Sequence, residues 1–257
     1  MSKSALRVLE IMEYIANQRD GCTHTSIARG LSIPKSSLTS LLQDLLSKGY
    51  LQRTLDSGVF TIGVQVLWLS NSYLRNLNLV KLGQPLVAEI YLKVKEFSIL
   101  AIPNGAEYVT ICTESVPSIF GHALQLGSRG PMFCSALGKA MLAFMPEDQI
   151  DEILRGSPRE KVTQYSNTSL TKIKASLAET RKTGISVSRE ESIAGVIGFA
   201  APVFSATGAP VAAFGVGLPA SHFKPEMAKG IELALKAAAR QLSEQLGWRP
   251  SNNRFPG

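Results

Sequence analysis

Residues 34–51 read PKSSLTSLLQDLLSKGYL, and this stretch decides how the first part of the chain folds. Its leucines recur at intervals of three and four residues, so they line one side of a helix. They are Leu38, Leu41, Leu42, Leu45 and Leu46. Pro34 suits the first helical position because its missing N–H has no intrahelical partner there. Gly49, directly after Lys48, tolerates the left-handed conformation in which helices often end.

The opposite face of this helix carries short hydroxyl and amide side chains, whereas most solvated helix faces carry long charged pairs. It comprises Lys35, Ser36, Thr39, Ser40, Gln43 and Ser47. Short polar side chains let a helix backbone come close to base edges, as a helix in a DNA major groove must. An ordinary amphipathic helix with a serine-rich outer face remains the alternative when this stretch is taken alone.

The segment upstream favours the DNA-binding interpretation over the ordinary amphipathic helix. Residues 23–31 predict a short helix, and residues 32–33 predict a tight turn before the leucine-lined helix. Two short helices joined by a few residues form a helix-turn-helix.

The segment downstream predicts a wing. Residues 50–54 and 59–62 are strand-like, and the Asp, Ser and Gly between them supply the chemistry of a hairpin turn. The chain therefore predicts a winged helix-turn-helix, with Arg53 and Thr54 where the wing meets phosphate.

Short motifs recur in order along the N-terminal part of the chain: SALRVLE at 4–10, Ile27-Ala28, PKSS at 34–37, KGYL at 48–51 and TIG at 61–63. Together they resemble the IclR family of bacterial transcription regulators. A second group, PMFCSALGKAMLA at 131–143 and Gly195 followed by AAPV at 200–203, resembles the effector domain of that family. The resemblance runs from about Ser4 to Gly247.

Length and charge set the broad organisation. A chain of 257 residues is long enough for two domains, and its net charge of +7 favours an anionic partner. Residues 1–62 carry only seven Lys or Arg against five Asp or Glu, a net charge of +2. DNA affinity comes largely from the phosphates that a protein neutralises, and one DNA-binding domain with this charge neutralises few of them. We therefore expect two DNA-binding domains, called heads, to be paired in a homodimer, with a homotetramer as the alternative.

The predicted fold class is α+β. We expect a DNA-binding domain at 1–63, a linker helix at 64–78, an effector-binding domain at 79–247 and a polar tail at 248–257. The linker stretch Val64–Arg75 lacks acidic residues; a packing helix of the second domain is the alternative. In the second domain, helical and strand-like stretches predict a mostly antiparallel sheet flanked by helices. The resemblance implies that this domain is GAF-like.

The nine residues that we expect to contact operator DNA lie within residues 23–62. They are Thr25, Lys35, Ser36, Ser37, Thr39, Ser40, Gln43, Arg53 and Thr54. Family members commonly carry a long basic side chain near Ser40, so a direct guanine contact is missing there.

Ser135 precedes an apolar helix predicted at 136–145, where it suits an N-cap that leaves backbone N–H groups of residues 136–138 open toward an anion. Plain capping without a ligand is the alternative. The resemblance implies a small organic effector, often a carboxylate, at this helix start. The residues that match effector-binding positions of the family are Phe120, Ser135, Ala136, Leu137, Ser188, Gly198, Gly215 and Gly217.

Several of these positions depart from the family pattern. Ser188 replaces a common acidic residue, Gly198 a cysteine, Gly215 and Gly217 serines, and the nearby Phe133 a histidine. These changes predict a roomier, more apolar cavity for an aromatic carboxylate or a related degradation product. The alternative is that these glycines only allow close packing on their strands and do not enlarge a cavity.

Other functions are less favoured by the sequence. Gly130, Gly138 and Lys139 lack P-loop spacing, Cys134 has no activating partner at motif spacing, and Glu190-Glu191 would point to opposite faces of a strand. We expect no enzyme, cofactor, metal site or membrane partner, and a cytoplasmic location in keeping with three widely spaced cysteines. The prediction is a ligand-responsive DNA-binding regulator, such as a repressor of a catabolic operon. A protein-interaction module that uses the winged head is the alternative.

Overall fold

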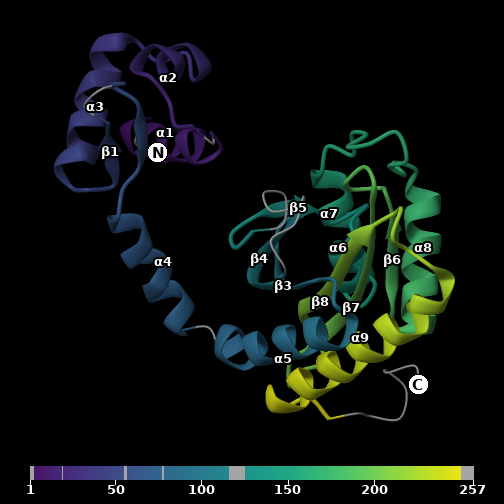
Figure 1. The fold of residues 1–257 in the computed structure, drawn as a ribbon. Coiled ribbons are helices and arrows are strands. Elements are labelled where there is room, and N and C mark those ends of the chain that lie inside the picture. The colour runs from purple at the N-terminus through teal and green to yellow at the C-terminus, as the bar shows by residue number, and fades with distance from the viewer. Residues whose placement is uncertain (1–2, 19, 55–56, 77, 116–124, 250–257) are drawn as a thin grey trace. The chain divides into compact units, whose positions relative to one another are not determined.

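The computed structural model describes residues 3–18, 20–54, 57–76, 78–115 and 125–249. The chain divides into two compact units, Met1–Leu77 and Asn78–Gly257. Figure 1 labels most elements of the two units, which are described separately below.

The N-terminal unit is the predicted winged helix-turn-helix. It contains α1 (Lys3–Ala16), α2 (His24–Gly30), α3 (Lys35–Ser47), β1 (Leu51–Arg53), β2 (Phe60–Ile62) and α4 (Gln65–Asn76). Ile11 of α1, Ile27 of α2 and Leu38 of α3 are fully buried together in its core. The strands β1 and β2 pair antiparallel to form the wing.

Local signals explain where these elements begin and end. The Thr23 hydroxyl accepts a hydrogen bond from the backbone N–H of Ser26 and so caps α2. Pro34 lies at the N-cap of α3, one residue earlier than predicted. Gly49 follows α3 with φ of +72°, a conformation that glycine adopts without steric cost. The helix α4 occupies the stretch predicted as a linker helix, and it belongs to the N-terminal unit.

The second unit is built on a six-stranded antiparallel sheet with the strand order β5-β4-β3-β8-β7-β6. Its strands are β3 (Phe97–Asn104), β4 (Glu107–Glu114), β5 (Arg129–Pro131), β6 (Ser186–Arg189), β7 (Val196–Phe204) and β8 (Pro210–Pro219). Asn104 pairs with Glu107, so a hairpin turn at Ala106 and its neighbour Gly105 joins β3 to β4. With the helices described next, the sheet confirms the α+β class.

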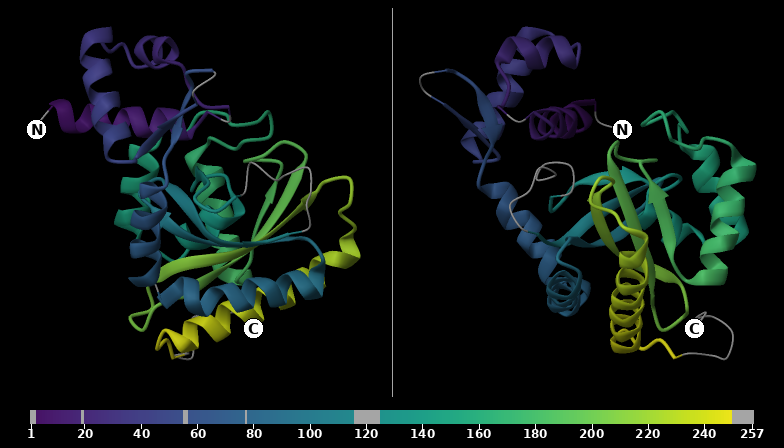
Figure 2. Two further views of the ribbon diagram at one scale, coloured as in Figure 1. Left: turned by 60° about the vertical axis from the view of Figure 1, so that its left-hand side comes forward. Right: turned by 45° about the vertical axis from the view of Figure 1, so that its right-hand side comes forward.

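Helices cover both faces of the sheet, as the two views in Figure 2 show. The helices are α5 (Asn78–Val94), α6 (Ala136–Leu142), α7 (Glu147–Gly156), α8 (Leu170–Thr183) and α9 (Pro225–Gln245). On one face, α5 and α9 bury Leu100 of β3 and Phe214 of β8. On the other face, α6 lies directly on β7 and β8, and α7 and α8 complete its apolar cluster.

Small residues allow α6 to approach the sheet closely. Every residue of α6 is buried, and the strands beneath it present Ala200 and Gly215, which are paired across β7 and β8. On the helix side, a Cβ at Gly138 would overlap the backbone of Met132. The absence of a side chain at Gly138 therefore sets the distance between α6 and the segment that precedes it.

The structure also differs from the sequence-based expectation in the C-terminal unit. Neither β5 nor α7 was predicted from the sequence. The helix α6 ends at Leu142, three residues before the expected Met145. Trp248 was assigned to the polar tail, but it is buried and stacks on Phe204 with ring centroids 5.7 Å apart. The packed domain thus extends through Trp248, because burying the indole ring away from water stabilises the folded state.

Replacing Gly138 by Ala is expected to lower the free energy of unfolding of the C-terminal unit by about 1–3 kcal/mol, because the new methyl group has backbone as its neighbour and cannot be accommodated by a rotamer change. Urea unfolding followed by tryptophan fluorescence measures this change. Gly230→Ala in α9 is the matched control: its Cβ meets nothing within 4 Å, so this helical substitution should raise stability by up to ~1 kcal/mol. Equal effects at the two glycines would contradict the close-approach argument.

Candidate DNA-binding face and ligand cavity

The nine predicted DNA-binding residues are all exposed. Thr25 lies on α2, Arg53 ends β1 and Thr54 follows it. The other six occupy the outer face of α3: Lys35, Ser36, Ser37, Thr39, Ser40 and Gln43. The buried leucines Leu38, Leu42 and Leu45 hold the opposite face of α3 against the core.

Two contacts adjust the roles expected on this face. The Thr39 hydroxyl donates to the carbonyl oxygen of Lys35 at 2.8 Å, so its oxygen accepts from His24 Nε2 at 3.0 Å. The hydroxyl proton of Thr39 is therefore already used in a hydrogen bond within the protein. His24 was not predicted from sequence, because its partner lies 15 residues away on the next helix.

On the wing, the Arg53 guanidinium lies over the Phe60 ring, 5.5 Å from the ring centroid. This cation–π contact restrains a long side chain while leaving its donors accessible.

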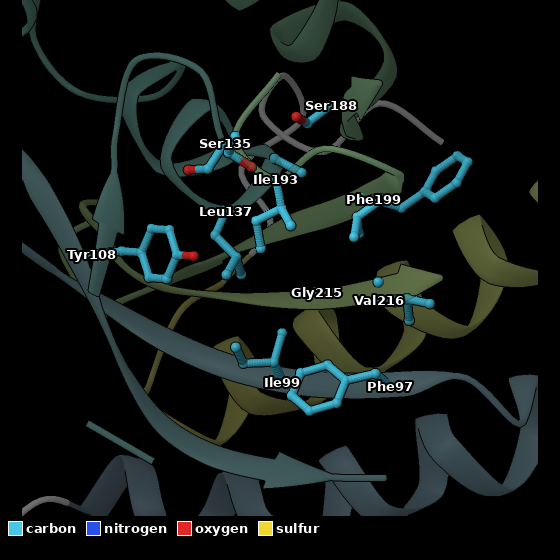
Figure 3. A pocket seen from close by; sticks show the side chains of 15 residues that line it. Phe97, Ile99, Tyr108, Ser135, Leu137, Ser188, Ile193, Phe199, Gly215 and Val216 are labelled. Carbon is cyan, nitrogen blue, oxygen red and sulfur yellow. The ribbon is translucent and has the colours of Figure 1, made fainter. Parts of the chain in front are cut away.

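A cavity of about 50 Å³ lies between the start of α6 and the sheet of the C-terminal unit. Its lining includes seven of the eight predicted effector residues: Ser135, Ala136, Leu137, Ser188, Gly198, Gly215 and Gly217. The eighth, Phe120, lies outside the described residues. Apolar side chains that include Phe97, Ile99 and Ile193 complete the wall (Figure 3).

The prediction that glycine would enlarge this cavity is wrong at Gly215. A Cβ there would lie 2.9 Å from both Leu137 Cδ2 and Ile99 Cγ2, so neighbouring side chains already fill the space. A Cβ at Gly198 would likewise meet the Ala136 methyl group at 3.3 Å. Phe133 is buried but does not line the cavity. A single buried water needs roughly 10–15 Å³, so the cavity holds only a few waters.

Two hydroxyl groups in the lining, those of Ser135 and Ser188, are committed to the protein. Ser135 Oγ accepts from the Gly138 N–H at 3.0 Å and donates to the Pro131 carbonyl oxygen at 2.6 Å. Ser188 Oγ donates to the Cys134 carbonyl oxygen at 3.0 Å. The cap thus closes one of the three N–H groups expected to be open. The N–H groups of Ala136 and Leu137 have no hydrogen-bond partner within the described part of the chain.

Tyr108 is a cavity residue that sequence reasoning missed. It lies on β4 opposite Gly130, and Figure 3 shows its hydroxyl directed toward Leu137. No described residue hydrogen-bonds to that hydroxyl. Burial raises the pKa of Tyr108 to about 12, so the phenol stays neutral and can donate a proton. A tyrosine among apolar strand residues was the available signal, because its polar tip usually finds a partner when buried.

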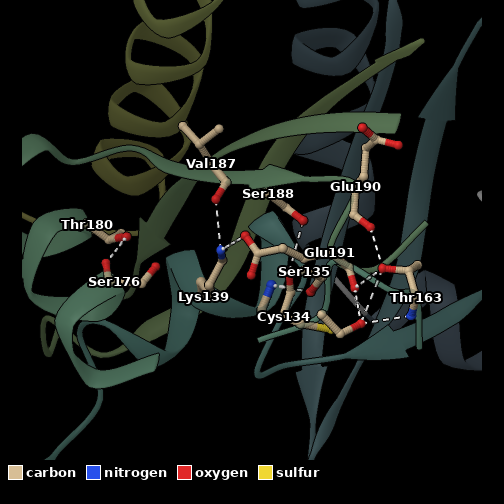
Figure 4. Close-up of polar contacts among 12 residues, drawn as sticks. Cys134, Ser135, Lys139, Thr163, Ser176, Thr180, Val187, Ser188, Glu190 and Glu191 are labelled. Carbon is tan, nitrogen blue, oxygen red and sulfur yellow. Dashed lines mark hydrogen bonds and ion pairs between the residues drawn. The ribbon is translucent and has the colours of Figure 1, made fainter. Parts of the chain in front are cut away.

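A buried lysine lies directly behind the cavity. Lys139 Nζ, one turn into α6, contacts the Val187 carbonyl oxygen at 2.8 Å and Glu191 Oε1 at 2.7 Å. The segment before α8 contributes hydroxyl groups to the same network (Figure 4). Thr163 Oγ1 donates to the Glu190 carbonyl oxygen at 2.7 Å, and Ser166 Oγ donates to that of Glu191 at 2.6 Å.

Two family models match this chain. Residues 4–55 match the IclR helix-turn-helix domain, and residues 71–244 match the C-terminal domain of the bacterial transcriptional regulator IclR. The second match spans more than half of the sequence. The chain belongs to the IclR family.

Similar proteins agree with this membership. The HTH-type transcriptional repressor AllR of Klebsiella pneumoniae is 26% identical over 244 residues, which cover 95% of this chain and 90% of AllR. A solved structure from Rhodococcus sp. RHA1 is 27% identical, has a TM-score of 0.82 and covers 96% of this chain and 98% of its own. An IclR homolog from Microbacterium hydrocarbonoxydans, complexed with 4-hydroxybenzoate, shows the same fold at 21% identity, with a TM-score of 0.80 and coverage of 95% and 99%. This IclR-type protein is a DNA-binding transcriptional regulator.

The relatives of this IclR-type chain are regulators, which argues against an enzyme. The chemistry of its cysteines agrees: burial raises the pKa values of Cys112 and Cys134 to about 12, and it also raises that of Cys22. Within the described ranges, no three His, Cys, Asp or Glu side chains are arranged to hold a metal ion. No helix in the same ranges has both the length and the apolar composition needed to cross a bilayer.

We expect the native IclR-type protein to resist a thiol reagent such as Ellman's reagent at pH 8. A thiol with a pKa near 12 is only about one part in 10⁴ thiolate at that pH, and the thiolate is the reactive form. Raising the pH toward 12 increases the thiolate fraction, so any slow reaction should accelerate. After unfolding in guanidinium chloride, all three cysteines should react at once. One rapid equivalent in the native protein would contradict the inert-thiol assignment.

Proposed function

We propose that this regulator binds operator DNA through residues 23–62 and holds a small carboxylic acid in the cavity at the start of α6. One observation carries the second half of the proposal: Ala136, Leu137 and Tyr108 line one apolar cavity, and among the described residues the N–H groups of Ala136 and Leu137 and the Tyr108 hydroxyl have no hydrogen-bond partner. Three donors of this kind suit a carboxylate, which accepts hydrogen bonds at both oxygens.

The apolar lining supports an acid with an apolar body. The carboxylate would face Ala136, Leu137 and Tyr108, and the body would contact Ile99 and Ile193. The family homolog that holds 4-hydroxybenzoate supports an aromatic acid as the effector. Because the cavity measures only about 50 Å³, an aromatic ring would require part of the wall to move outward.

Tyr108→Phe is expected to weaken binding of a carboxylate effector without changing the size of the cavity. A hydrogen bond to a charged group contributes about 1.5–3 kcal/mol, which corresponds to a loss of affinity of roughly ten- to a hundredfold. Isothermal titration calorimetry with pyruvate, glyoxylate, benzoate and 4-hydroxybenzoate measures it. Tyr14→Phe, in the N-terminal unit, is the matched control and should bind as the unsubstituted protein does.

The outcome of this titration decides two points. Equal affinities for Tyr108→Phe and the unsubstituted protein would remove Tyr108 from the site. Tight binding of glyoxylate or pyruvate, with none of the benzoate-like acids, would reject an aromatic effector while leaving the carboxylate site intact.

The exposed apolar residues of the N-terminal unit support self-association. Leu6 and Leu9 of α1 are exposed, as are Leu67 and Trp68 of α4. With a net charge of only +2 in residues 1–62, a single head neutralises few phosphates, so two heads would bind DNA better. We therefore propose a homodimer, with a homotetramer as the alternative, in the cytoplasm where the operator is accessible.

Regulation requires that the effector bind two arrangements of the protein with different affinities. We propose α4 as the element that carries this difference, because it joins the head to the effector-binding domain, and its exposed Leu67 and Trp68 are available to a second copy of the chain.

Lys35→Ala and Gln43→Ala are expected to affect DNA binding differently. Loss of Lys35 removes a phosphate contact, so affinity should fall about equally for operator and random DNA, with a salt slope shallower by about one. Loss of Gln43 should cost roughly 1–3 kcal/mol on operator DNA and little on random DNA. Titration of fluorescent upstream DNA at two salt concentrations, with random competitor, distinguishes them. Ser47→Ala, at the far end of α3, is the control.

The same titration separates the proposed function from its rival. If neither operator nor random DNA is bound, with or without a pool of acids, the winged head would be a protein-interaction module. An equal loss on both DNAs for Gln43→Ala would exclude Gln43 from base recognition.

A further inference from the structure

The loop between β6 and β7, residues 190–195, forms one wall of the effector cavity. Ser192 and Ile193 of this loop line the cavity together with Ser188 of β6. The loop closes on itself, because Glu190 Oε2 accepts from the Gly195 N–H at 2.9 Å. The position of this loop therefore contributes directly to the size of the cavity.

Lys139 ties this wall to the helix that carries the proposed carboxylate site. Its side chain is 3% exposed and that of Glu191 is 19% exposed, so the pair is shielded from water on the lysine side. Its ammonium bridges two points of the wall, the Val187 carbonyl oxygen and the Glu191 carboxylate, at 2.8 and 2.7 Å. A buried ion pair holds its geometry strictly, because separating the charges would leave one of them unpaired away from water.

The other side of the loop is held independently. Thr163 and Ser166, in the segment before α8, donate hydroxyl hydrogen bonds to the carbonyl oxygens of Glu190 and Glu191. The loop is thus fixed between a hydroxyl clamp at its backbone and an ion pair at its side chain.

We propose that the Lys139–Glu191 pair sets the size of the effector cavity and thereby selects which acids the regulator binds. This inference rests on the proposed effector function of the cavity. Lys139 does not line the cavity, so it is a positioning residue that acts through Ser192 and Ile193.

The pair has opposite consequences for small and large acids. With the wall held, Ser192 and Ile193 limit the cavity to about 50 Å³, a size that suits a short acid such as pyruvate. When the wall is released, Ile193 can move outward, so a short acid loses contacts while an aromatic ring gains room. Removal of the pair should therefore shift selectivity toward the larger acid.

The test replaces the pair by apolar residues of similar size in the double variant Lys139→Met/Glu191→Leu. An apolar pair leaves no uncompensated buried charge, so the domain is expected to stay folded. The matched control is Lys93→Met/Glu89→Leu on α5, which removes an ion pair of the same 2.7 Å length whose side chains are 54% and 51% exposed. Calorimetry with pyruvate and 4-hydroxybenzoate gives the ratio of dissociation constants, and hydrogen exchange reports the amides of residues 190–196.

In the double variant, the ratio of dissociation constants is expected to shift at least ~tenfold toward 4-hydroxybenzoate, and the amides of residues 190–196 are expected to exchange faster, whereas the control variant should keep both values unchanged. A double variant whose ratio and exchange rates match those of the unsubstituted protein would overturn the inference. If the unsubstituted protein binds neither acid, the proposed effector acids are wrong, and unchanged exchange in residues 190–196 would still overturn the role of the ion pair.

A second variant covers loss of folding in the first. Thr163→Val/Ser166→Ala loosens the same wall from its other side and leaves the buried charges paired. It should shift the ratio in the same direction, and a folded variant with an unshifted ratio would also overturn the inference.

Discussion

The close approach of α6 to the sheet is the constraint on which the C-terminal domain depends. Gly138 lets the helix contact the backbone of Met132, and the Ser135 cap fixes where the helix begins. Because all of α6 is buried, its orientation decides which backbone N–H groups meet the cavity and where Lys139 is directed. The cavity is the space that remains between a well-packed helix start and strands of small residues.

Within that space, satisfied and unsatisfied polar groups have different roles. The hydroxyls of Ser135 and Ser188 hydrogen-bond to the protein backbone and stabilise the wall. The Tyr108 hydroxyl and the N–H groups of Ala136 and Leu137 have no hydrogen-bond partner among the described residues. In the proposed function, these donors would orient the charged end of an acid, and the apolar walls would discriminate among acids by size.

The DNA-binding head likewise divides its side chains between those that fix the structure and those that are exposed for binding. Buried leucines fix the orientation of α3, while its outer face presents small side chains that carry little charge. The contact between His24 and Thr39 joins the two helices of the helix-turn-helix on that face. A reading head of this composition relies on close fit more than on charge, which is the physical reason that two copies would serve better than one.

The sequence by itself determined the winged helix-turn-helix, because leucine spacing, caps and turn residues act within a few residues of each other. Ser135 was predicted from a motif that resembles the family, Ser188 was predicted from its position in the same resemblance, and most strands were predicted from their apolar runs. Only the tertiary structure decided that Leu137 fills the space beside Gly215, that Trp248 packs on Phe204 and that Tyr108 faces the cavity. It also decided that Lys139 meets Glu191, 52 residues away. These contacts join segments far apart in the chain, and no local spacing encodes which side chains meet when the helix layer closes on the sheet.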